Sequence, residues 1–185
     1  MNAYLRIISV ALIAFLPLVG CSGSDLPMLS AKPDVSSYHL GPGDVLEIRV
    51  LGADELNGRY SVQDDGTIRM LMAGDVPAAG FTPEQVQNKI EDKLKAGRYV
   101  TQPRVTVVVS THRPYFILGE ILSPGAYPYV NGTTVLSAVA AGGGYTRRAN
   151  QDVVVITRNG EDSRAEIMTS VLPGDTIRVL ERSLF

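Results

Sequence analysis

The chain has 185 residues, 45% of them hydrophobic, and a formal net charge of −2 at pH 7. This length suits one compact domain or two small ones, and the weak charge without a basic block gives no reason to expect nucleic acid as a partner. The 18 glycines and 11 prolines are scattered among short apolar runs, which predicts strands and turns rather than a helical bundle. The single cysteine excludes an intrachain disulfide.

The first 20 residues have the pattern of a secretory signal peptide. Arg6 precedes an apolar run, residues 7–19, which is shorter than the ~20 residues of a membrane-spanning helix. The run ends at Gly20 and Cys21, which resembles a bacterial lipobox. Cleavage between these residues would leave Cys21 as a lipid-modified first residue, anchored to a membrane by its acyl chains. An ordinary signal peptide with a chance cysteine and an uncleaved anchor are the alternatives, and Ser22 resembles the outer-membrane sorting pattern of enterobacterial lipoproteins.

Residues 21–37 are rich in Ser, Gly, Pro and Asp, and this composition predicts a flexible tether. A first domain is expected over residues 38–110. It opens with Gly41-Pro42-Gly43-Asp44, which predicts a type II turn in which Gly43 takes a positive φ and the Asp44 carboxylate accepts backbone N–H groups. The alternating apolar and polar side chains of residues 45–50 then predict a half-buried strand.

Further along the first domain, residues 64–67 (Asp-Asp-Gly-Thr) predict a hairpin turn between two strands. A pair of catalytic carboxylates is the alternative interpretation of the same residues. Thr82 as an N-cap and Gln85 as its capping-box partner predict the start of a helix, and Gly97 its end. Alternation over residues 105–110 predicts the last strand of this domain.

A second domain is expected over residues 111–185, with several short strands and a helix over residues 135–141. Its turns and its helix stop are expected at Gly119-Glu120, Pro124-Gly125, Gly142-Gly143 and Pro173-Gly174-Asp175. The last of these repeats the Pro-Gly-Asp pattern of the first domain just before an apolar strand at residues 177–180. Since each half combines short strands with one helix, the sequence predicts an α+β fold of two small mixed-sheet domains.

Few residues have the pattern of a chemical site. His39 and His112 lack Cys, Asp or Glu at metal-ligand spacing, so a structural role is the simpler interpretation of both. The glycines of residues 142–144 follow a helix and lack the Lys-Ser/Thr of a phosphate-binding loop. No serine stands in a nucleophile-elbow context. No catalytic residue, metal or cofactor is therefore expected, and a binding, assembly or conduit component of the cell envelope is the most plausible class.

The order of these motifs resembles the signature of the Wza-like outer-membrane polysaccharide export family. In the first domain the matching residues are Gly41, Pro42, Gly43, Asp44, Asp65 and Gly66. From Phe116 onward the chain resembles a soluble-ligand-binding β-grasp (SLBB) domain. There the matching residues are Gly119, Glu120, Pro124, Gly125, Gly142, Gly143, Pro173, Gly174 and Asp175. All of them are expected to shape turns and helix ends rather than to perform chemistry.

The resemblance implies a lipoprotein attached to the periplasmic side of the outer membrane. It implies that copies of the chain assemble into a ring whose lumen passes an extracellular or capsular polysaccharide. It also implies contact with an inner-membrane polysaccharide copolymerase, and no enzymatic activity.

Two expectations qualify this resemblance. Larger members of the family form an outer-membrane pore with a C-terminal amphipathic helix, whereas only residues 181–185 follow the last expected strand here. The chain is thus expected not to span the membrane itself and to dock under a separate outer-membrane β-barrel. A periplasmic module that captures a soluble glycan or ligand without forming a pore is the alternative function.

Overall fold

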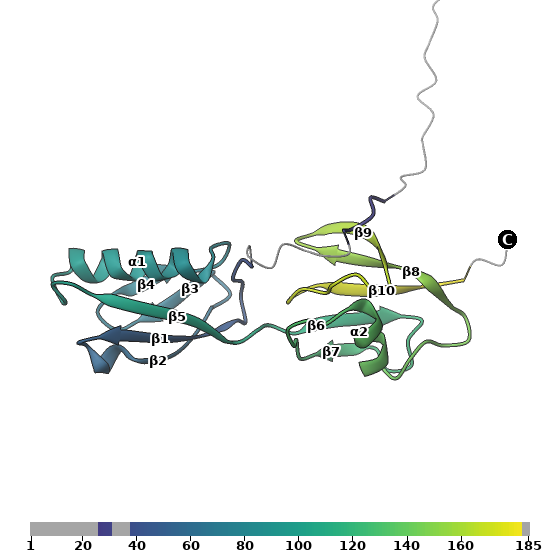
Figure 1. The fold of residues 1–185 in the computed structure, drawn as a ribbon, viewed down its shortest axis with the longest axis horizontal. Coiled ribbons are helices and arrows are strands. Elements are labelled where there is room, and N and C mark those ends of the chain that lie inside the picture. Colours follow the sequence, from purple (N-terminus) through teal and green to yellow (C-terminus); the bar gives the residue numbers. More distant parts are fainter. Residues whose placement is uncertain (1–25, 31–37, 183–185) are drawn as a thin grey trace, which may run out of the picture.

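Two domains, each with its own hydrophobic core, lie end to end along the long axis of the molecule (Figure 1). The computed structural model describes residues 26–30 and 38–182. The expected signal peptide and the lipobox residues Gly20 and Cys21 lie outside the described residues. Among the described residues, no helix combines the length and the apolar character needed to cross a membrane.

The first domain contains a three-stranded antiparallel sheet, a hairpin and one long helix. The sheet has the order β2-β1-β5, and β3 pairs with β4. The elements are β1 (Val45–Leu51), the 3-10 helix η2 (Asp54–Leu56), β2 (Gly58–Ser61), β3 (Thr67–Met70), β4 (Gly74–Pro77), α1 (Pro83–Ala96) and β5 (Arg104–Thr111). The helix runs from the junction between the domains to the far end of the first domain (Figure 1).

The core of the first domain follows from two periodic patterns. The period-two alternation of β1 turns Leu46, Ile48 and Val50 inward. Val86, Ile90 and Leu94 form the buried stripe of α1, each with 0% exposed surface. The helix begins at Thr82, which forms the predicted capping box with Gln85, and it ends at Gly97. Both predictions for this helix are confirmed.

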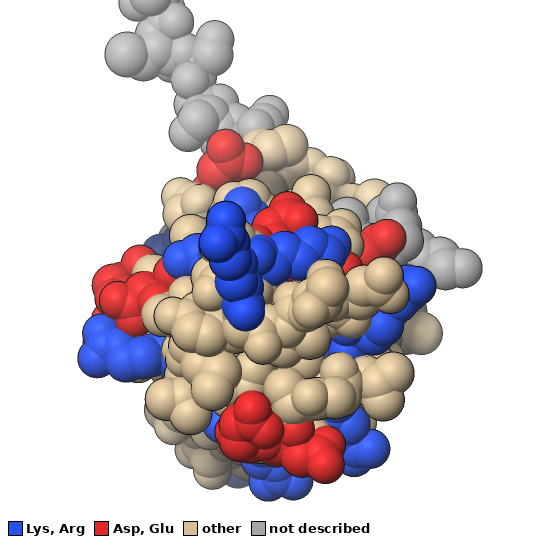
Figure 2. Space-filling view, turned by 90° about the vertical axis from the view of Figure 1, so that its left-hand side faces the viewer, with Lys and Arg blue, Asp and Glu red and all other residues tan. Residues whose placement is uncertain are grey.

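Figure 2 shows the end of the first domain that is farthest from the junction. Lys and Arg gather toward the top, over α1, whose last turn contains Lys93 and Lys95. Asp and Glu gather toward the bottom, where η2 contributes Asp54 and Glu55. A largely uncharged band lies between the two groups, and residues of the opposite sign lie beside each group, so charges of both signs are present above and below the band.

The second domain is a five-stranded mixed sheet in the order β7-β6-β10-β8-β9. Its last strand, β10, lies in the middle, parallel to β6 and antiparallel to β8. The elements are β6 (Tyr115–Gly119), β7 (Gly125–Tyr127), α2 (Val135–Ala141), β8 (Ala149–Arg158), β9 (Glu161–Glu166) and β10 (Thr176–Glu181). The buried face of α2 packs into the same core as Ile117, Ile156 and Ile177. The predicted α+β fold class is confirmed, and the mixed sheet lies in the second domain, since the strand pairs of the first domain are all antiparallel.

One predicted strand pairing is wrong. The turn at residues 64–67 forms, but the strands on its two sides do not pair with each other. β2 belongs to the sheet of β1, whereas β3 pairs with β4. The reason is a second, tight reversal after β3, in which Met72 takes a φ of 64°, so β3 folds back onto the residues that follow it rather than onto β2.

Part of the segment for which a tether is expected contacts the second domain. Met28 forms a parallel bridge with Arg164 of β9. The Leu29 N–H donates to the Arg164 carbonyl oxygen at 2.8 Å, and the Arg164 N–H donates to the Pro27 carbonyl oxygen at 2.8 Å. Residues 27–29 therefore cover the outer edge of β9, a position that would otherwise expose unpaired backbone groups.

Candidate functional site

The two Pro-Gly-Asp turns have the same hydrogen-bond geometry. In the first, the Asp44 N–H donates to the Gly41 carbonyl oxygen at 3.1 Å, and the Gly41 N–H donates to Asp44 Oδ2 at 2.8 Å. In the second, the Asp175 N–H donates to the Leu172 carbonyl oxygen at 3.1 Å, and the Leu172 N–H donates to Asp175 Oδ2 at 2.7 Å. The two turns are therefore one structural motif used twice, as the sequence indicated.

Glycine at the third position makes both turns possible. Gly43 has a φ of 92° and Gly174 a φ of 86°. A type II turn requires a positive φ at this position, which residues with a side chain rarely adopt. The turns place each aspartate at the start of a strand, Asp44 before β1 and Asp175 before β10.

Each of these aspartates is buried and faces an arginine. Asp44 has 0% and Asp175 has 1% exposed surface. Arg158 donates from Nε to Asp175 Oδ1 at 3.0 Å and from Nη2 to Asp175 Oδ2 at 2.7 Å, which is a bidentate pair. Arg113 donates from its backbone N–H to Asp44 Oδ1 at 2.8 Å and from Nη1 to Asp44 Oδ2 at 3.3 Å. Each buried carboxylate is therefore paired with a guanidinium group of opposite charge.

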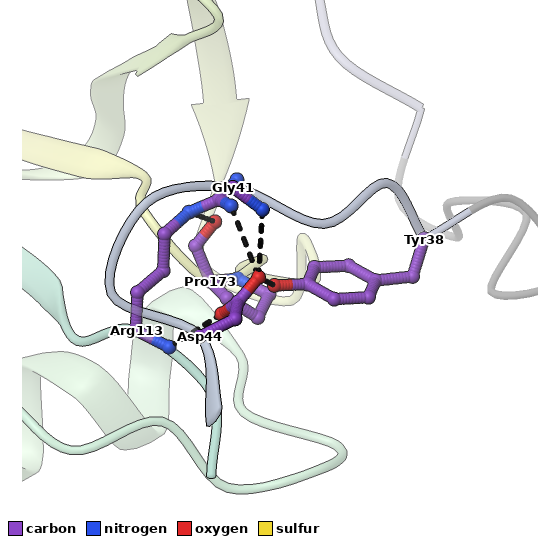
Figure 3. Close-up of polar contacts among 5 residues, drawn as sticks. All are labelled: Tyr38, Gly41, Asp44, Arg113 and Pro173. Carbon is purple, nitrogen blue, oxygen red and sulfur yellow. Dashed lines mark hydrogen bonds and ion pairs between the residues drawn. The ribbon is translucent and has the colours of Figure 1, made fainter. Parts of the chain in front are cut away.

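Arg113 also connects the two turns, as Figure 3 shows. It lies between β5 and β6, in the connection between the domains. While Nη1 contacts Asp44 of the first turn, Nε donates to the Pro173 carbonyl oxygen of the second at 3.1 Å. We call Tyr38, Gly41, Asp44, Arg113 and Pro173 the junction network.

Gly41 and Gly174 could not carry a side chain, because the guanidinium group of Arg113 lies too close to both. A Cβ on Gly41 would lie 1.9 Å from Arg113 Nη1, and a Cβ on Gly174 would lie 2.4 Å from Arg113 Nε. The φ of Gly41 is not positive, so this glycine is required for space rather than for backbone conformation. Each turn therefore contributes one glycine that makes room for Arg113.

Aromatic side chains enclose the network on one side. The Tyr38 hydroxyl donates to Asp44 Oδ2 at 2.6 Å. Burial is the main cause, and this hydrogen bond the second, of a pKa of Tyr38 well above its ordinary value. His112 lies edge-on between Tyr38 and Tyr129, with ring centroids 5.1 and 5.2 Å away. Burial lowers the pKa of His112, so the folded state favours the neutral imidazole.

The other residues singled out from the sequence lie apart from the junction. The Asp65 carboxylate accepts from the Thr67 N–H at 2.9 Å and closes its own turn together with Gly66. Glu120 accepts a hydrogen bond from Thr146. These contacts are local, and among the described residues no group of His, Cys, Asp and Glu could hold a metal ion.

The remaining residues that were singled out from the sequence are four glycines and one proline. A Cβ on Gly119 would lie 2.1 Å from the Val179 carbonyl oxygen, where β6 meets β10. Gly142 is the C-cap of α2, and Gly143, with a φ of 82°, follows it. Pro124 immediately precedes β7, whose first residue is Gly125. The structure therefore brings together the two Pro-Gly-Asp turns and leaves these positions elsewhere in the fold.

No pattern in the sequence singles out Arg113 or Arg158. Asp44 and Arg113 are 69 positions apart, and no local pattern links them. The available signal was indirect: two aspartates in apolar surroundings require cations, and an arginine stands in the short connection between the expected domains.

The fold and the junction define a two-domain α+β protein in which a mixed-sheet domain follows a sheet-and-helix domain. Residues 32–110 match the family model of the polysaccharide biosynthesis/export protein, and residues 114–166 match the model of the SLBB domain. The chain therefore combines a polysaccharide biosynthesis/export domain with one SLBB domain, the arrangement expected from the sequence. Proteins of this family are transport components rather than enzymes, as expected from the sequence.

Curated relatives agree with this family. The exopolysaccharide production protein ExoF of Rhizobium meliloti (strain 1021) is 34% identical over 149 residues, which cover 75% of this chain and 34% of the relative. The polysialic acid transport protein KpsD of Escherichia coli is 26% identical over 152 residues, which cover 80% of this chain and 26% of the relative. The chain thus spans about a third or less of the length of these relatives.

Proposed function

We propose that this chain is a lipoprotein subunit of an oligomeric conduit that exports an extracellular or capsular polysaccharide. The family supports a role in polysaccharide export, and the names of ExoF and KpsD refer to exopolysaccharide production and polysialic acid transport. The conduit, its lipid anchor and its partners are our extension of that role.

The observation that carries the proposal is the junction network. A ring of identical subunits closes only if every subunit presents the same two surfaces at the same angle. Arg113, bonded to Asp44 of the first domain and to Pro173 of the second, restricts the angle between the domains. Such a fixed angle suits a subunit that has to repeat around a closed ring.

The ring proposal is tested by electron microscopy and native mass spectrometry of the detergent-solubilised full chain. We expect closed rings of one size. A monodisperse monomer at micromolar concentration would contradict a conduit built from copies of this chain. In cells, deletion of the gene should abolish surface polysaccharide while polymer synthesis continues, and the wild-type gene should restore it.

The proposed anchor is the lipid on Cys21, on the periplasmic side of the outer membrane. Replacing Cys21 by Ala removes the thiol that would accept the lipid, so we expect the variant to leave the membrane fraction and to lose incorporation of labelled palmitate. Replacing Ser22 by Ala is the matched control and should change neither. Unchanged labelling of the Cys21→Ala variant would contradict the anchor. Crosslinking in membranes would test the proposed contact with an inner-membrane copolymerase.

A periplasmic glycan- or ligand-binding module is the second candidate function, favoured by a pocket that Arg113 and Arg158 line. The two candidates differ in oligomeric state and in export. A stable monomer that binds sugar, from a gene whose deletion leaves surface polysaccharide unchanged, would favour the binding module.

A further inference from the structure

A pocket of about 210 Å³, which both arginines line, opens at the junction of the two domains. Tyr38 and His39 line it from the first domain, and Arg158, Asn159 and the 172–175 turn line it from the second, with Arg113 between them. A wider hollow of about 500 Å³ shares His39, Arg113 and Asn159 with this pocket. Drug-sized ligands occupy pockets of roughly 300–1,000 Å³, so the smaller space fits a compact polar group or a single sugar residue.

The positively charged side chains of the pocket are more exposed than its negatively charged one. Two guanidinium groups, of Arg113 and Arg158, line it against the single carboxylate of Asp175. The arginine side chains are 22% and 20% exposed, whereas the Asp175 side chain is 2% exposed. A ligand in the pocket would therefore meet the guanidinium donors more readily than the carboxylate of Asp175, because that carboxylate is almost fully buried.

Each guanidinium group retains unused donors. Arg113 uses Nε and Nη1, and Arg158 uses Nε and Nη2, in bonds to the protein. Arg113 Nη2 and Arg158 Nη1 make no hydrogen bond to any residue that the structure describes. Each of these nitrogen atoms carries N–H groups that can reach a ligand.

Both arginines are held in place before any ligand arrives. The bidentate pair with Asp175 and a 3.1 Å bond from Nη2 to the Ser170 carbonyl oxygen fix Arg158. The contacts to Asp44 and Pro173 fix Arg113. Because these side chains are already ordered, binding would cost little additional conformational entropy. Guanidinium donors in a fixed fork recognise carboxylate and phosphate oxygens in particular.

We propose that the junction pocket is an oxyanion-binding site in which Arg113 and Arg158 bind the carboxylate of an acidic sugar or a free phosphate. The ligand contacts the connection between the domains and the second domain, since Arg113 lies in the connection and Arg158 in the second domain. Its binding stabilises the junction by mass action. An acidic sugar as the natural ligand rests on the proposed export function, whereas the oxyanion site itself does not.

The test is isothermal titration calorimetry of the full chain in detergent at low ionic strength, with glucuronate, inorganic phosphate and glucose as separate probes. We expect at least one of the anions to bind at millimolar concentration or below and glucose to bind at least about tenfold more weakly, because it lacks the charge. Tighter binding of glucuronate assigns the site to an acidic sugar, and tighter binding of phosphate assigns it to the free ion. Equal binding of glucose, or no binding of either anion, overturns the proposal.

A matched pair of variants locates the site. Asn159 is exposed with a φ of 53°, a conformation that Asp also tolerates, so Asn159→Asp adds a negative charge at the pocket with little backbone strain. We expect anion binding to weaken by about tenfold. Asn88→Asp makes the same change on an exposed position of α1 outside both pockets, and should change affinity by less than about twofold. Equal affinities of the two variants overturn the proposal.

An independent measurement covers the case in which the Asn159 variant does not fold, which its thermal unfolding curve would reveal. Raising the salt concentration from about 10 mM to about 150 mM should weaken anion binding to the unmodified chain several-fold, since the site is partly exposed. An affinity that does not depend on salt overturns the proposal. These measurements use purified protein and do not depend on polysaccharide export. Anion binding can therefore be absent while export in cells is intact, and export can be absent while anion binding is intact.

Discussion

Four hydrogen-bond donors converge on the carboxylate of Asp44, which has no exposed surface. They are the Gly41 N–H at 2.8 Å, the Tyr38 hydroxyl at 2.6 Å, and the backbone N–H and Nη1 of Arg113 at 2.8 and 3.3 Å. A carboxylate offers about four lone-pair sites, so this group is fully satisfied. At the scale of single residues, the junction is therefore sensitive to the loss of any one partner, because a buried charge without its partners is costly.

Replacing Arg113 by Ala removes the cation that faces Asp44 and leaves the carboxylate buried. We expect the free energy of unfolding to fall by about 3–5 kcal/mol, measured by urea denaturation. The control is Arg49→Ala, which breaks an exposed ion pair with Glu47 and should cost less than about 1 kcal/mol. Similar losses for the two variants would show that the junction network does not carry the stability assigned to it.

The partly buried ring of His112 should make the stability of the fold depend on pH. Its pKa in the folded state lies below the ordinary value of 6.5 because the ring is buried. The unfolded state therefore binds more protons than the folded state as the pH falls below 6.5. The contribution of His112 to stability is full above that pH and is lost as the pH falls through the folded-state pKa.

The His112→Phe variant keeps the aromatic contacts and removes the titrating group. We expect its thermal unfolding temperature to fall less than that of the unmodified chain between pH 7 and pH 5. The exposed His39, replaced by Gln, serves as the control and should leave the acid-induced loss in place. If the His112→Phe variant loses as much stability in acid as the unmodified chain, another group dominates this pH range.

At the scale of elements, each Pro-Gly-Asp turn precedes a strand that has neighbours on both sides. β1 lies between β2 and β5, and β10 lies between β6 and β8. Interior strands set the position of the strands that pair with them. A change in either turn would therefore be transmitted to the interior of one sheet and, through Arg113, to the other domain.

The Gly41→Ala variant tests this packing by size alone. The added methyl group would lie 1.9 Å from Arg113 Nη1, so the guanidinium has to move and its bond to Asp44 weakens. We expect a loss of about 1–3 kcal/mol. Gly58→Ala is the control because its nearest contact would be an ordinary 3.8 Å to Tyr60 Cε2 and its φ is not positive. Equal unfolding free energies for the two variants would contradict the requirement for space beside Arg113.

At the scale of the whole molecule, the junction network restricts the relative orientation of two domains that have separate cores. A Lys at position 113 keeps the charge but loses the planar fork that reaches both Asp44 and Pro173. We expect Arg113→Lys to leave each domain folded and to broaden the distribution of angles between them.

Double electron–electron resonance measures the distribution of distances between two spin labels, and this distribution reports on the angle between the domains. The chain has one cysteine, so a Cys21→Ala background allows spin labels at the exposed positions 88 and 166, one in each domain, with unlabelled chain added to dilute contacts between copies. We expect one narrow distance for the unmodified junction, a broader distribution for Arg113→Lys, and no change for the exposed control Arg49→Lys. A narrow distance in all three chains would show that Arg113 does not fix the angle.

The sequence predicted what depends on neighbours in the chain. The alternation of residues 45–50, the capping box of Thr82 and Gln85, and both Pro-Gly-Asp turns are local patterns, and the structure contains all of them. Pairings between distant segments could not be derived in this way. The partner of β3 depended on the reversal at Met72, and the contact of Arg113 with Asp44 and Pro173 spans 69 and 60 positions.

The central place of β10 has a consequence for the order of folding. Residues 176–181 are synthesised after every other strand of the five-stranded sheet, yet they join β6 to β8. Until they emerge, the two halves of that sheet have no common neighbour, and Asp175 cannot meet Arg158. The second domain therefore completes late during synthesis, with long-range pairing that is intrinsically slow.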